Sequence, residues 1–252
     1  MTTEPHIEEN INNLKRFLFK DKIRLGKGND GGYVIAKNLK YDLFLSAGIE
    51  NDISFEIDFL KFNPELNCLA YDKQSSINQS PLKNLEIVKK NISPNKSADT
   101  ENLKDISEKH KDIFLKMDIE GHEFEWINSF NLFKNIKQMV IEFHRIIEPP
   151  RLRNEYHNSK WGRNSTEKER WKALEKINQT HYLIHLHPNN NCTEANGYYA
   201  VPELLELTFL RKTEFNCMPE LDLSPIPSTL DIKNVKDKPE FNLTGYPYTK
   251  QK

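Results

Sequence analysis

Residues 113–122 read Ile113-Phe114-Leu115-Lys116-Met117-Asp118-Ile119-Glu120-Gly121-His122. The apolar first half followed by acids and a glycine predicts a buried strand that ends in a loop. Ligands of open α/β sheets bind at the carboxyl ends of the strands, so we expect Asp118 and Glu120 at the edge of a pocket. Two carboxylates facing one side of a pocket indicate a metal site or an acid–base pair. The alternative is an acidic helix N-terminus that complements the helix dipole.

Length and composition favour one domain over 1–252, because 252 residues are enough for a single large core. We expect the core at about 23–215, an N-terminal helix within 1–22 and an extended C-terminal tail at 218–252. The 36 Lys and Arg residues balance 37 Asp and Glu residues, and this near-neutral charge disfavours a nucleic-acid partner. The oligomeric state stays open.

Targeting and cysteine patterns are also informative. No apolar run approaches the roughly 20 residues that a membrane span needs, and the first 20 residues lack the apolar core of a secretory signal. We therefore expect no membrane span and a cytoplasmic location. The cysteines Cys68, Cys192 and Cys217 are widely spaced, so they indicate neither a disulfide framework nor a zinc site.

Strand-like and helix-like segments alternate over most of the chain. Strands are predicted at 41–46, 67–72, 85–91, 113–117, 138–145, 181–188 and 203–211. Helical spacing is found at 7–20, 54–62, 122–130 and 166–179, and weakly at 103–110. Because the first five strands alternate with helices, the pattern predicts an α/β fold with a doubly wound, seven-stranded sheet.

Two glycine-containing loops are candidates for ligand contact. Four glycines within residues 26–32 predict a loop with unusual dihedrals or a close backbone approach, although a plain hairpin would also explain them. No Gly-Lys-Ser/Thr follows, so this is not a phosphate-binding Walker loop. The loop at Gly48 lies between a strand and a helix, which places backbone donors near a ligand. Asp72 ends the next strand and could bind a ribose or stabilise a turn.

Polar residues at later strand ends extend this set. Glu142 and His144 alternate onto one side of their strand and could meet Asp118 if the two strands are neighbours. Carboxylate and imidazole groups suit a divalent cation or a general base; a hydrogen-bonded structural histidine is the alternative. His187 and Asn189 lie at the end of the following strand.

The irregular segment 148–170 is basic and contains Tyr156 and Trp161. Its arginines Arg151, Arg153 and Arg163 could bind phosphates beside an aromatic ring, or could belong to a solvated loop.

Taken in series, these motifs resemble the class I S-adenosylmethionine-dependent methyltransferases, and specifically the FkbM-type group. The resemblance covers roughly residues 23–210. It rests on Leu115-Lys116-Met117-Asp118-Ile119-Glu120-Gly121-His122-Glu123, on Gly31-Gly32-Tyr33-Val34, on Ser46-Ala47-Gly48 with Asp52-Ile53-Ser54-Phe55-Glu56, and on Asp72. The chain departs from the usual first methyltransferase motif by keeping one glycine where several are common.

The resemblance implies a Rossmann-like class I methyltransferase sheet with helices on both faces. It also implies O-methylation of a sugar, which we expect to be linked to a nucleotide and used for capsule or another surface polysaccharide. The residues expected to bind S-adenosylmethionine are Gly31, Tyr33, Ser46, Ala47, Gly48, Asp52, Ser54, Asp72 and Asp118. The residues expected to bind the substrate are Glu120, His122, Arg151, Arg153, Arg163 and Asn189.

For the chemistry we expect Asp118, Glu142, His144 and His187 to act as catalytic residues, because an alcohol needs help to lose its proton. The first three could instead hold Mg²⁺ or Mn²⁺. Two other readings stay open. One is a small-molecule methyltransferase without a metal, and the other is a non-catalytic nucleotide- or sugar-binding protein. A Rossmann oxidoreductase is less well supported, since Gly48 lacks the spaced glycines that a pyrophosphate needs.

Overall fold

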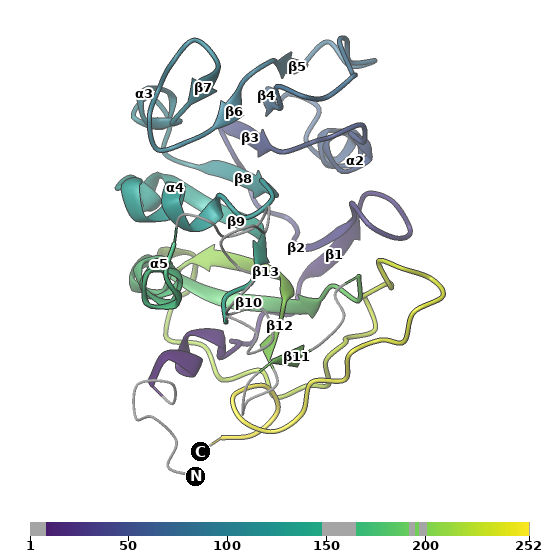
Figure 1. Ribbon diagram of the computed structural model, residues 1–252, viewed down its shortest axis with the longest axis vertical. Coiled ribbons are helices and arrows are strands. Elements are labelled where there is room, and N and C mark those ends of the chain that lie inside the picture. Colours follow the sequence, from purple (N-terminus) through teal and green to yellow (C-terminus); the bar gives the residue numbers. More distant parts are fainter. Residues whose placement is uncertain (1–8, 148–164, 192–194, 197–200, 252) are drawn as a thin grey trace.

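The computed structural model describes residues 9–147, 165–191, 195–196 and 201–251 (Figure 1). Its centre is a seven-stranded sheet with the order β10-β13-β9-β8-β3-β4-β5. The strands are β3 (Leu43–Ala47), β4 (Cys68–Tyr71), β5 (Leu85–Val88), β8 (Ile113–Met117), β9 (Ile136–His144), β10 (His181–Pro188) and β13 (Leu204–Arg211). All seven predicted strands are present.

The sheet is mixed. β13 pairs antiparallel with both β9 and β10, whereas β3, β4, β5, β8 and β9 pair parallel with one another. β8 lies between β3 and β9, and all five of its residues are buried, as expected for a strand covered on both faces. The predicted doubly wound, Rossmann-like sheet is confirmed. Strands β8 and β9 are neighbours, as the candidate site requires.

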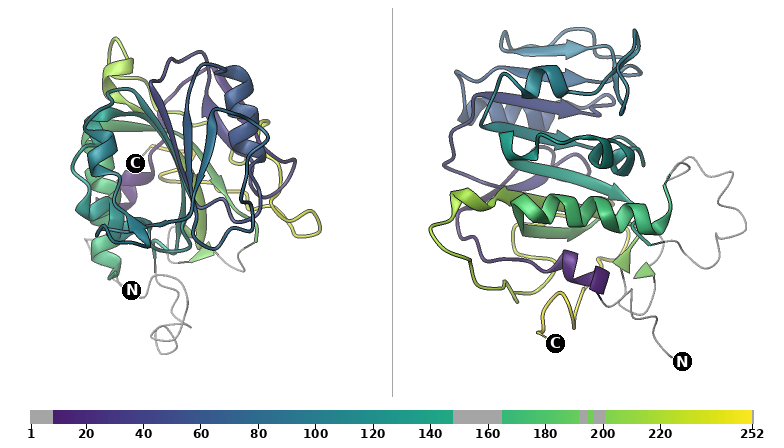
Figure 2. Two further views of the ribbon diagram at one scale, coloured as in Figure 1. Left: turned by 90° about the horizontal axis from the view of Figure 1, so that it is seen from above. Right: turned by 90° about the vertical axis from the view of Figure 1, so that its left-hand side faces the viewer.

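Helices cover both faces of this sheet (Figure 2). On one face lie α3 (Lys104–Ser107), α4 (Glu123–Ser129) and α5 (Glu167–Thr180), and on the other lie α2 (Ser54–Phe62) and a hairpin of β1 (Lys22–Leu25) and β2 (Tyr33–Ala36). Side chains along β8 point alternately to the two faces of the sheet. Leu115 and Met117 pack in the core cluster of the α4 and α5 face, and Phe114 packs with α2 on the other.

Local signals explain why the predicted helices form where they do. α5 begins with a capping box, in which the Thr166 side chain accepts from the backbone of Glu169 and the Glu169 side chain accepts from the backbone of Thr166. Its buried stripe contains Trp171, Leu174 and Ile177, the three residues whose spacing predicted it. The remaining short elements are η1 (Ile11–Leu14), β6 (Asn91–Ile92), β7 (Thr100–Glu101), η2 (Phe133–Asn135), β11 (Ala195–Asn196), β12 (Val201–Pro202) and η5 (Lys212–Glu214).

The N-terminal helix predicted at 7–20 is wrong beyond Leu14. In the described part of this segment, residues 9–10 are helical and the η1 turn follows, and the chain is already extended at Lys15. The backbone N–H of Phe17 donates to the carbonyl of Leu183 at 2.7 Å, and Leu18 donates to Glu220 at 2.8 Å. Backbone partners on the edge strand β10 and on the tail therefore outweigh the helical spacing of the apolar residues.

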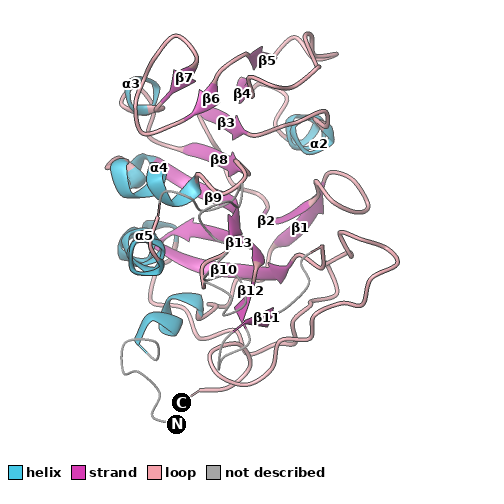
Figure 3. Ribbon diagram, in the orientation of Figure 1, coloured by secondary structure: helices cyan, strands magenta, loops and turns pink. Residues whose placement is uncertain are grey.

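The C-terminal segment 215–251 runs as loops and turns along the β10 side of the sheet, away from β4 and β5 (Figure 3). Leu243 and Tyr248 are buried in the main core, and Asp222 forms a 3.7 Å ion pair with the buried Arg16. Among the described residues, no helix combines the length and the apolar character needed to cross a bilayer.

This packing predicts that the tail stabilises the whole domain. Leu243→Ala should lower the free energy of unfolding by about 2–5 kcal/mol, because it leaves a cavity in a core position that is 3% exposed. Leu223→Ala, at a tail position 38% exposed, should change it by less than about 0.5 kcal/mol. Denaturant unfolding measures both, and equal small effects would mean that the tail contributes nothing to the core.

Candidate active site

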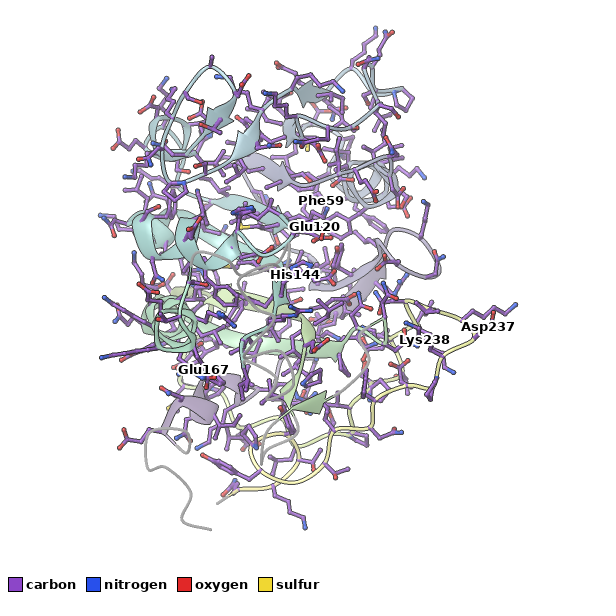
Figure 4. The ribbon with its side chains drawn as sticks, viewed as in Figure 1. Phe59, Glu120, His144, Glu167, Asp237 and Lys238 are labelled. Carbon is purple, nitrogen blue, oxygen red and sulfur yellow. The ribbon has the colours of Figure 1, made fainter. Side chains whose placement is uncertain are left out.

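The loop after β8 and the end of β9 bring three polar side chains together. The Nε2 atom of His144 lies 3.9 Å from Oδ1 of Asp118 and 4.0 Å from Oε2 of Glu120. Figure 4 shows Glu120 and His144 close together near the middle of the molecule. His144 is buried, whereas the side chains of Asp118 and Glu120 are 27% and 55% exposed. The group therefore forms a partly open acidic site at the carboxyl ends of two neighbouring strands, where open α/β sheets bind ligands.

Glu123, in the first turn of α4, is a fourth member that the sequence did not reveal. Its Oε1 atom lies 3.2 Å from Nδ1 of His144 and accepts the backbone N–H groups of Ile119 at 3.0 Å and Gly121 at 3.1 Å. Its side chain is fully buried. A glutamate at this position resembles an ordinary acidic residue at a helix start, so only the burial distinguishes it.

The β1–β2 hairpin and the end of β3 are tied to the same site. The Tyr33 hydroxyl donates to Oδ2 of Asp118 at 3.2 Å. Gly48 has a φ of +79°, and a Cβ there would lie 1.6 Å from the carbonyl oxygen of Asp118. The carbonyl of Gly48 accepts a hydrogen bond from the Nζ of Lys116. Gly48 is thus required because the ends of β3 and β8 approach each other too closely for a side chain.

Other residues expected to contact the cofactor hold the surrounding loops. Asp52 accepts hydrogen bonds from the N–H and the hydroxyl of Ser54 and forms a 3.2 Å ion pair with Lys27. A Cβ on Gly31 would lie 2.6 Å from the Asp52 carboxylate, so the hairpin passes close to this loop. Ser46 is buried and donates to Glu56 at 2.5 Å, which turns its side chain towards α2. Ala47 is buried at the end of β3.

Asp72 joins the loop after β3 to the loop after β4. One carboxylate oxygen accepts the N–H groups of Ile49 and Glu50, and the other accepts those of Gln74 and Ser75. This is the turn-stabilising role that the sequence left open beside ribose binding.

Glu142 lies on the same face as His144 but has different partners. Its Oε1 accepts from Nδ2 of Asn189 at 2.9 Å, and its carboxylate groups with those of Asp30 and Glu206 within 4.8 Å. Asp118 and His144 belong to a different group, in which Glu123 is the third residue with a ligand atom within 4.8 Å of the other two. The expected metal set of Asp118, Glu142 and His144 is therefore divided between two clusters of the described residues.

The remaining expected residues lie apart from this centre or outside the description. His187 is buried between strand and tail, with Nδ1 2.9 Å from Glu206 and Nε2 3.6 Å from Glu240. His122 precedes α4, is 54% exposed, and lies 3.6 Å from Glu125. Arg151, Arg153 and Arg163 lie outside the described residues.

Comparisons with known proteins identify the family. A family model for the methyltransferase FkbM domain matches residues 7–162, which is more than half of the chain. The chain belongs to the FkbM methyltransferase family. No curated protein matches the sequence.

Two solved structures match this FkbM methyltransferase over part of the chain, at low sequence identity. A fibrillarin/NOP5P complex gives a TM-score of 0.40 at 10% identity, covering 69% of this chain and 74% of the other. A mutant of the 16S rRNA (adenine(1408)-N(1))-methyltransferase from Catenulisporales acidiphilia, with its cosubstrate SAM, gives a TM-score of 0.36 at 12% identity, covering 75% of this chain and 96% of the other.

Burial and neighbouring charges alter proton affinities in this methyltransferase. Burial alone would lower the pKa of His144, but Glu123, Glu142 and Asp118 outweigh it and raise that pKa to about 10. Burial raises the pKa of Asp118 to about 6, against the opposing effect of Lys116 and His144. Burial would also raise the pKa of Glu123, but the charge and hydrogen bond of His144 lower it below its ordinary value. Glu123 is accordingly a carboxylate that accepts the Nδ1 proton of an imidazolium at neutral pH.

This arrangement predicts a specific pH dependence of stability. Because the pKa of His144 is raised from 6.5 to about 10 in the folded state, its protonation stabilises the fold. The contribution is complete below about pH 6.5 and is lost as the pH rises through about 10. His144→Gln removes it, so the stability difference between wild type and variant should shrink from neutral pH to about pH 10.

Denaturant unfolding at several pH values measures this difference. His122→Gln, which removes an exposed histidine, serves as the matched control. A His144→Gln difference that stays constant over this range would show that the ion pair with Glu123 contributes no net stability.

Proposed function

We propose that this FkbM methyltransferase transfers the methyl group of S-adenosylmethionine to a hydroxyl group of a sugar, with a nucleotide-linked sugar as the acceptor. The observation that supports it best is the placement of His144 Nε2 within 4.0 Å of both Asp118 and Glu120. An imidazole can receive a hydroxyl proton, and two flanking carboxylates can accept hydrogen bonds from adjacent hydroxyls. Neighbouring hydroxyls are the distinguishing chemistry of a sugar.

The residues at the strand ends fit the cofactor. S-adenosylmethionine supplies a methyl group that is already activated on a sulfonium. Asp118 is half-buried beside the Gly48 loop, and its carboxylate suits a cationic sulfonium or ammonium group. Tyr33 donates to the opposite oxygen of Asp118 and so fixes its orientation.

The role of His144 is to hold and then move one proton. Its Nε2 atom would take the proton from the acceptor hydroxyl while the methyl group passes from the sulfonium sulfur to that oxygen, leaving S-adenosylhomocysteine, and Glu123 would stabilise the resulting imidazolium. Only the neutral imidazole can act, and its pKa is about 10. The rate should therefore rise with pH across the neutral and mildly alkaline range.

The nucleotide half of the acceptor is assigned to the segment with Arg151, Arg153 and Arg163. Guanidinium groups bind phosphate oxygens in bidentate fashion, and nearby aromatic rings can stack on a base. Asn189, which contacts Glu142, lies at the end of β10 and could contribute to the same acceptor site. Support for the arginines comes from the sequence.

A divalent cation is the alternative means of activating the hydroxyl. Asp118, Glu123 and His144 offer ligand atoms within 4.8 Å of one another, a set that would suit Mg²⁺ or Mn²⁺. The Oε1 atom of Glu123 is already shared by two backbone N–H groups and His144, so a cation would be ligated by Oε2, which has no hydrogen-bond partner among the described residues.

The cofactor assignment predicts a loss of affinity in Asp72→Ala. If Asp72 accepts ribose hydroxyls in addition to its four backbone N–H groups, S-adenosylmethionine binding should weaken by about 1–3 kcal/mol. Calorimetry measures the change. Asn51→Ala is the matched control, because its side chain also joins these two loops, through Ser76. Equal losses in both variants would mean that Asp72 acts through loop geometry, and unchanged affinity in a folded Asp72→Ala variant would refute the ribose role.

The chemical assignment predicts that His144→Gln lowers kcat by about 10²–10⁴-fold, the usual contribution of a general base. A panel of nucleotide-linked sugars with isotope-labelled cofactor supplies the assay. Wild-type activity should survive dialysis against a chelator. Activity that is lost and then restored by Mg²⁺ or Mn²⁺ would support the cation instead.

The same assay separates the proposed enzyme from its alternatives. Methyl transfer to a small amine or acid, with no sugar accepted, would assign a different acceptor class. Failure to bind S-adenosylmethionine or S-adenosylhomocysteine would leave a non-catalytic binding protein.

A further inference from the structure

We propose that Glu123 is the positioning residue of this site, which sets both the orientation of the His144 ring and the shape of the loop that carries Asp118 and Glu120. The inference rests on the proposed function, in which His144 is the base. It deepens that function by assigning a residue outside the expected catalytic set.

One oxygen atom connects the two parts of the site. Glu123 Oε1 is 3.0 Å from the N–H of Ile119, 3.1 Å from that of Gly121 and 3.2 Å from Nδ1 of His144. The loop and the imidazole ring thus form hydrogen bonds with the same oxygen atom, and that atom belongs to a side chain with no exposed surface. A fully buried side chain in a close-packed layer has little freedom to move.

The loop needs such a support because its backbone is unusual. Glu120 has a φ of +57° and Gly121 a φ of +94°. The left-handed region costs a non-glycine residue about 1–2 kcal/mol, and such a conformation persists when the surroundings fix it. Hydrogen bonds from the flanking N–H groups of Ile119 and Gly121 to Glu123 supply that fixation.

The ring needs the support for a different reason. An imidazole ring can rotate about its bond to Cβ. Because the ring is rigid, a hydrogen bond that holds Nδ1 also fixes the position of Nε2. With Nδ1 on Glu123, Nε2 faces Asp118 and Glu120 and not the core. The carboxylate also stabilises the imidazolium that forms when the base takes a proton, as in other arrangements of base and orienting acid.

Four carboxylates face or approach this imidazole, and they have different roles. Asp118 and Glu120 lie on the open side, with carboxylate oxygens 3.9 and 4.0 Å from Nε2 of His144. Glu142 lies two residues before His144 on β9. Glu123 alone among these four is 3.2 Å from a ring nitrogen and also bound to the loop. Replacing Glu123 should therefore change the orientation of the His144 ring and the shape of the loop, whereas replacing one of the other three carboxylates should not.

The test is Glu123→Gln, which keeps an acceptor oxygen of the same reach but removes the charge. In protein with isotope-labelled histidine, the Nδ1 proton of His144 should give a far-downfield NMR signal in wild type. This signal should shift upfield or exchange away in the variant. Glu125→Gln, on the same helix turn and paired with the exposed His122, should leave the signal unchanged.

Kinetics supply the second readout. Glu123→Gln should lower kcat by about 100-fold, and the KM for the cofactor should change by less than about threefold. If Glu123 acts through His144, the double variant Glu123→Gln/His144→Gln should lose no more than about threefold beyond His144→Gln alone. Thermal unfolding confirms that each variant is folded.

Two outcomes would overturn the inference. An unchanged Nδ1 signal in a folded Glu123→Gln variant would show that the carboxylate does not orient the ring. Losses of rate that multiply in the double variant would show that Glu123 supports the fold independently of His144. If the wild type transfers no methyl group to any acceptor, the proposed function fails, but the NMR comparison still decides the role of Glu123.

Discussion

The site depends on β8 being hydrogen-bonded on both sides, to β3 and to β9. These pairings place the end of β8 against Gly48 on one side and bring Asp118 close to His144 on the other. β8 is buried on both faces, and its carboxylates emerge where the strand ends, at Asp118 and in the loop that follows it. The topology therefore concentrates the acidic residues and the histidine at one edge of the sheet.

Burying an imidazole among carboxylates is unfavourable unless the charges compensate one another. A buried ion pair is stabilising only when its geometry is good and its remaining hydrogen-bonding atoms have partners. The Oε1 atom of Glu123 meets this condition, because His144 and two backbone N–H groups converge on it. The Oε2 atom does not meet it, since it is buried without a hydrogen-bond partner among the described residues. A second cluster joins the exposed Asp30 to the buried Glu142 and Glu206, and it accepts hydrogen bonds from the side-chain amides of Asn189 and Asn234. The two clusters divide the polar face into the proposed reaction centre and a junction with the hairpin and tail.

The elements that the sequence predicts correctly are those in which a local pattern coincides with burial. The seven strands and the helices α2, α4 and α5 have a clear period or a cap, so their positions could be predicted. The N-terminal helix failed because Phe17 pairs with the tail, a partner that lies about 200 positions away in the chain. Helical spacing cannot reveal such a partner.

The candidate site was predicted in part for the same reason. Adjacent strand ends brought Asp118 and His144 together, because neighbouring parallel strands follow from the fold class. Glu123 was missed, since a first-turn glutamate normally faces water and only tertiary packing buries it. The partners of Glu142 and the backbone hydrogen bonds of Asp72 likewise depend on loops whose course a sequence does not specify.

A crystal structure of the enzyme with S-adenosylhomocysteine and its sugar acceptor tests the central claim most directly. The account predicts the cofactor's sulfur beside the Gly48 loop and Asp118, with an acceptor hydroxyl oxygen within hydrogen-bond distance of His144 Nε2 and Nδ1 still against Glu123. A cofactor bound elsewhere, or an acceptor oxygen facing a different base, would contradict it.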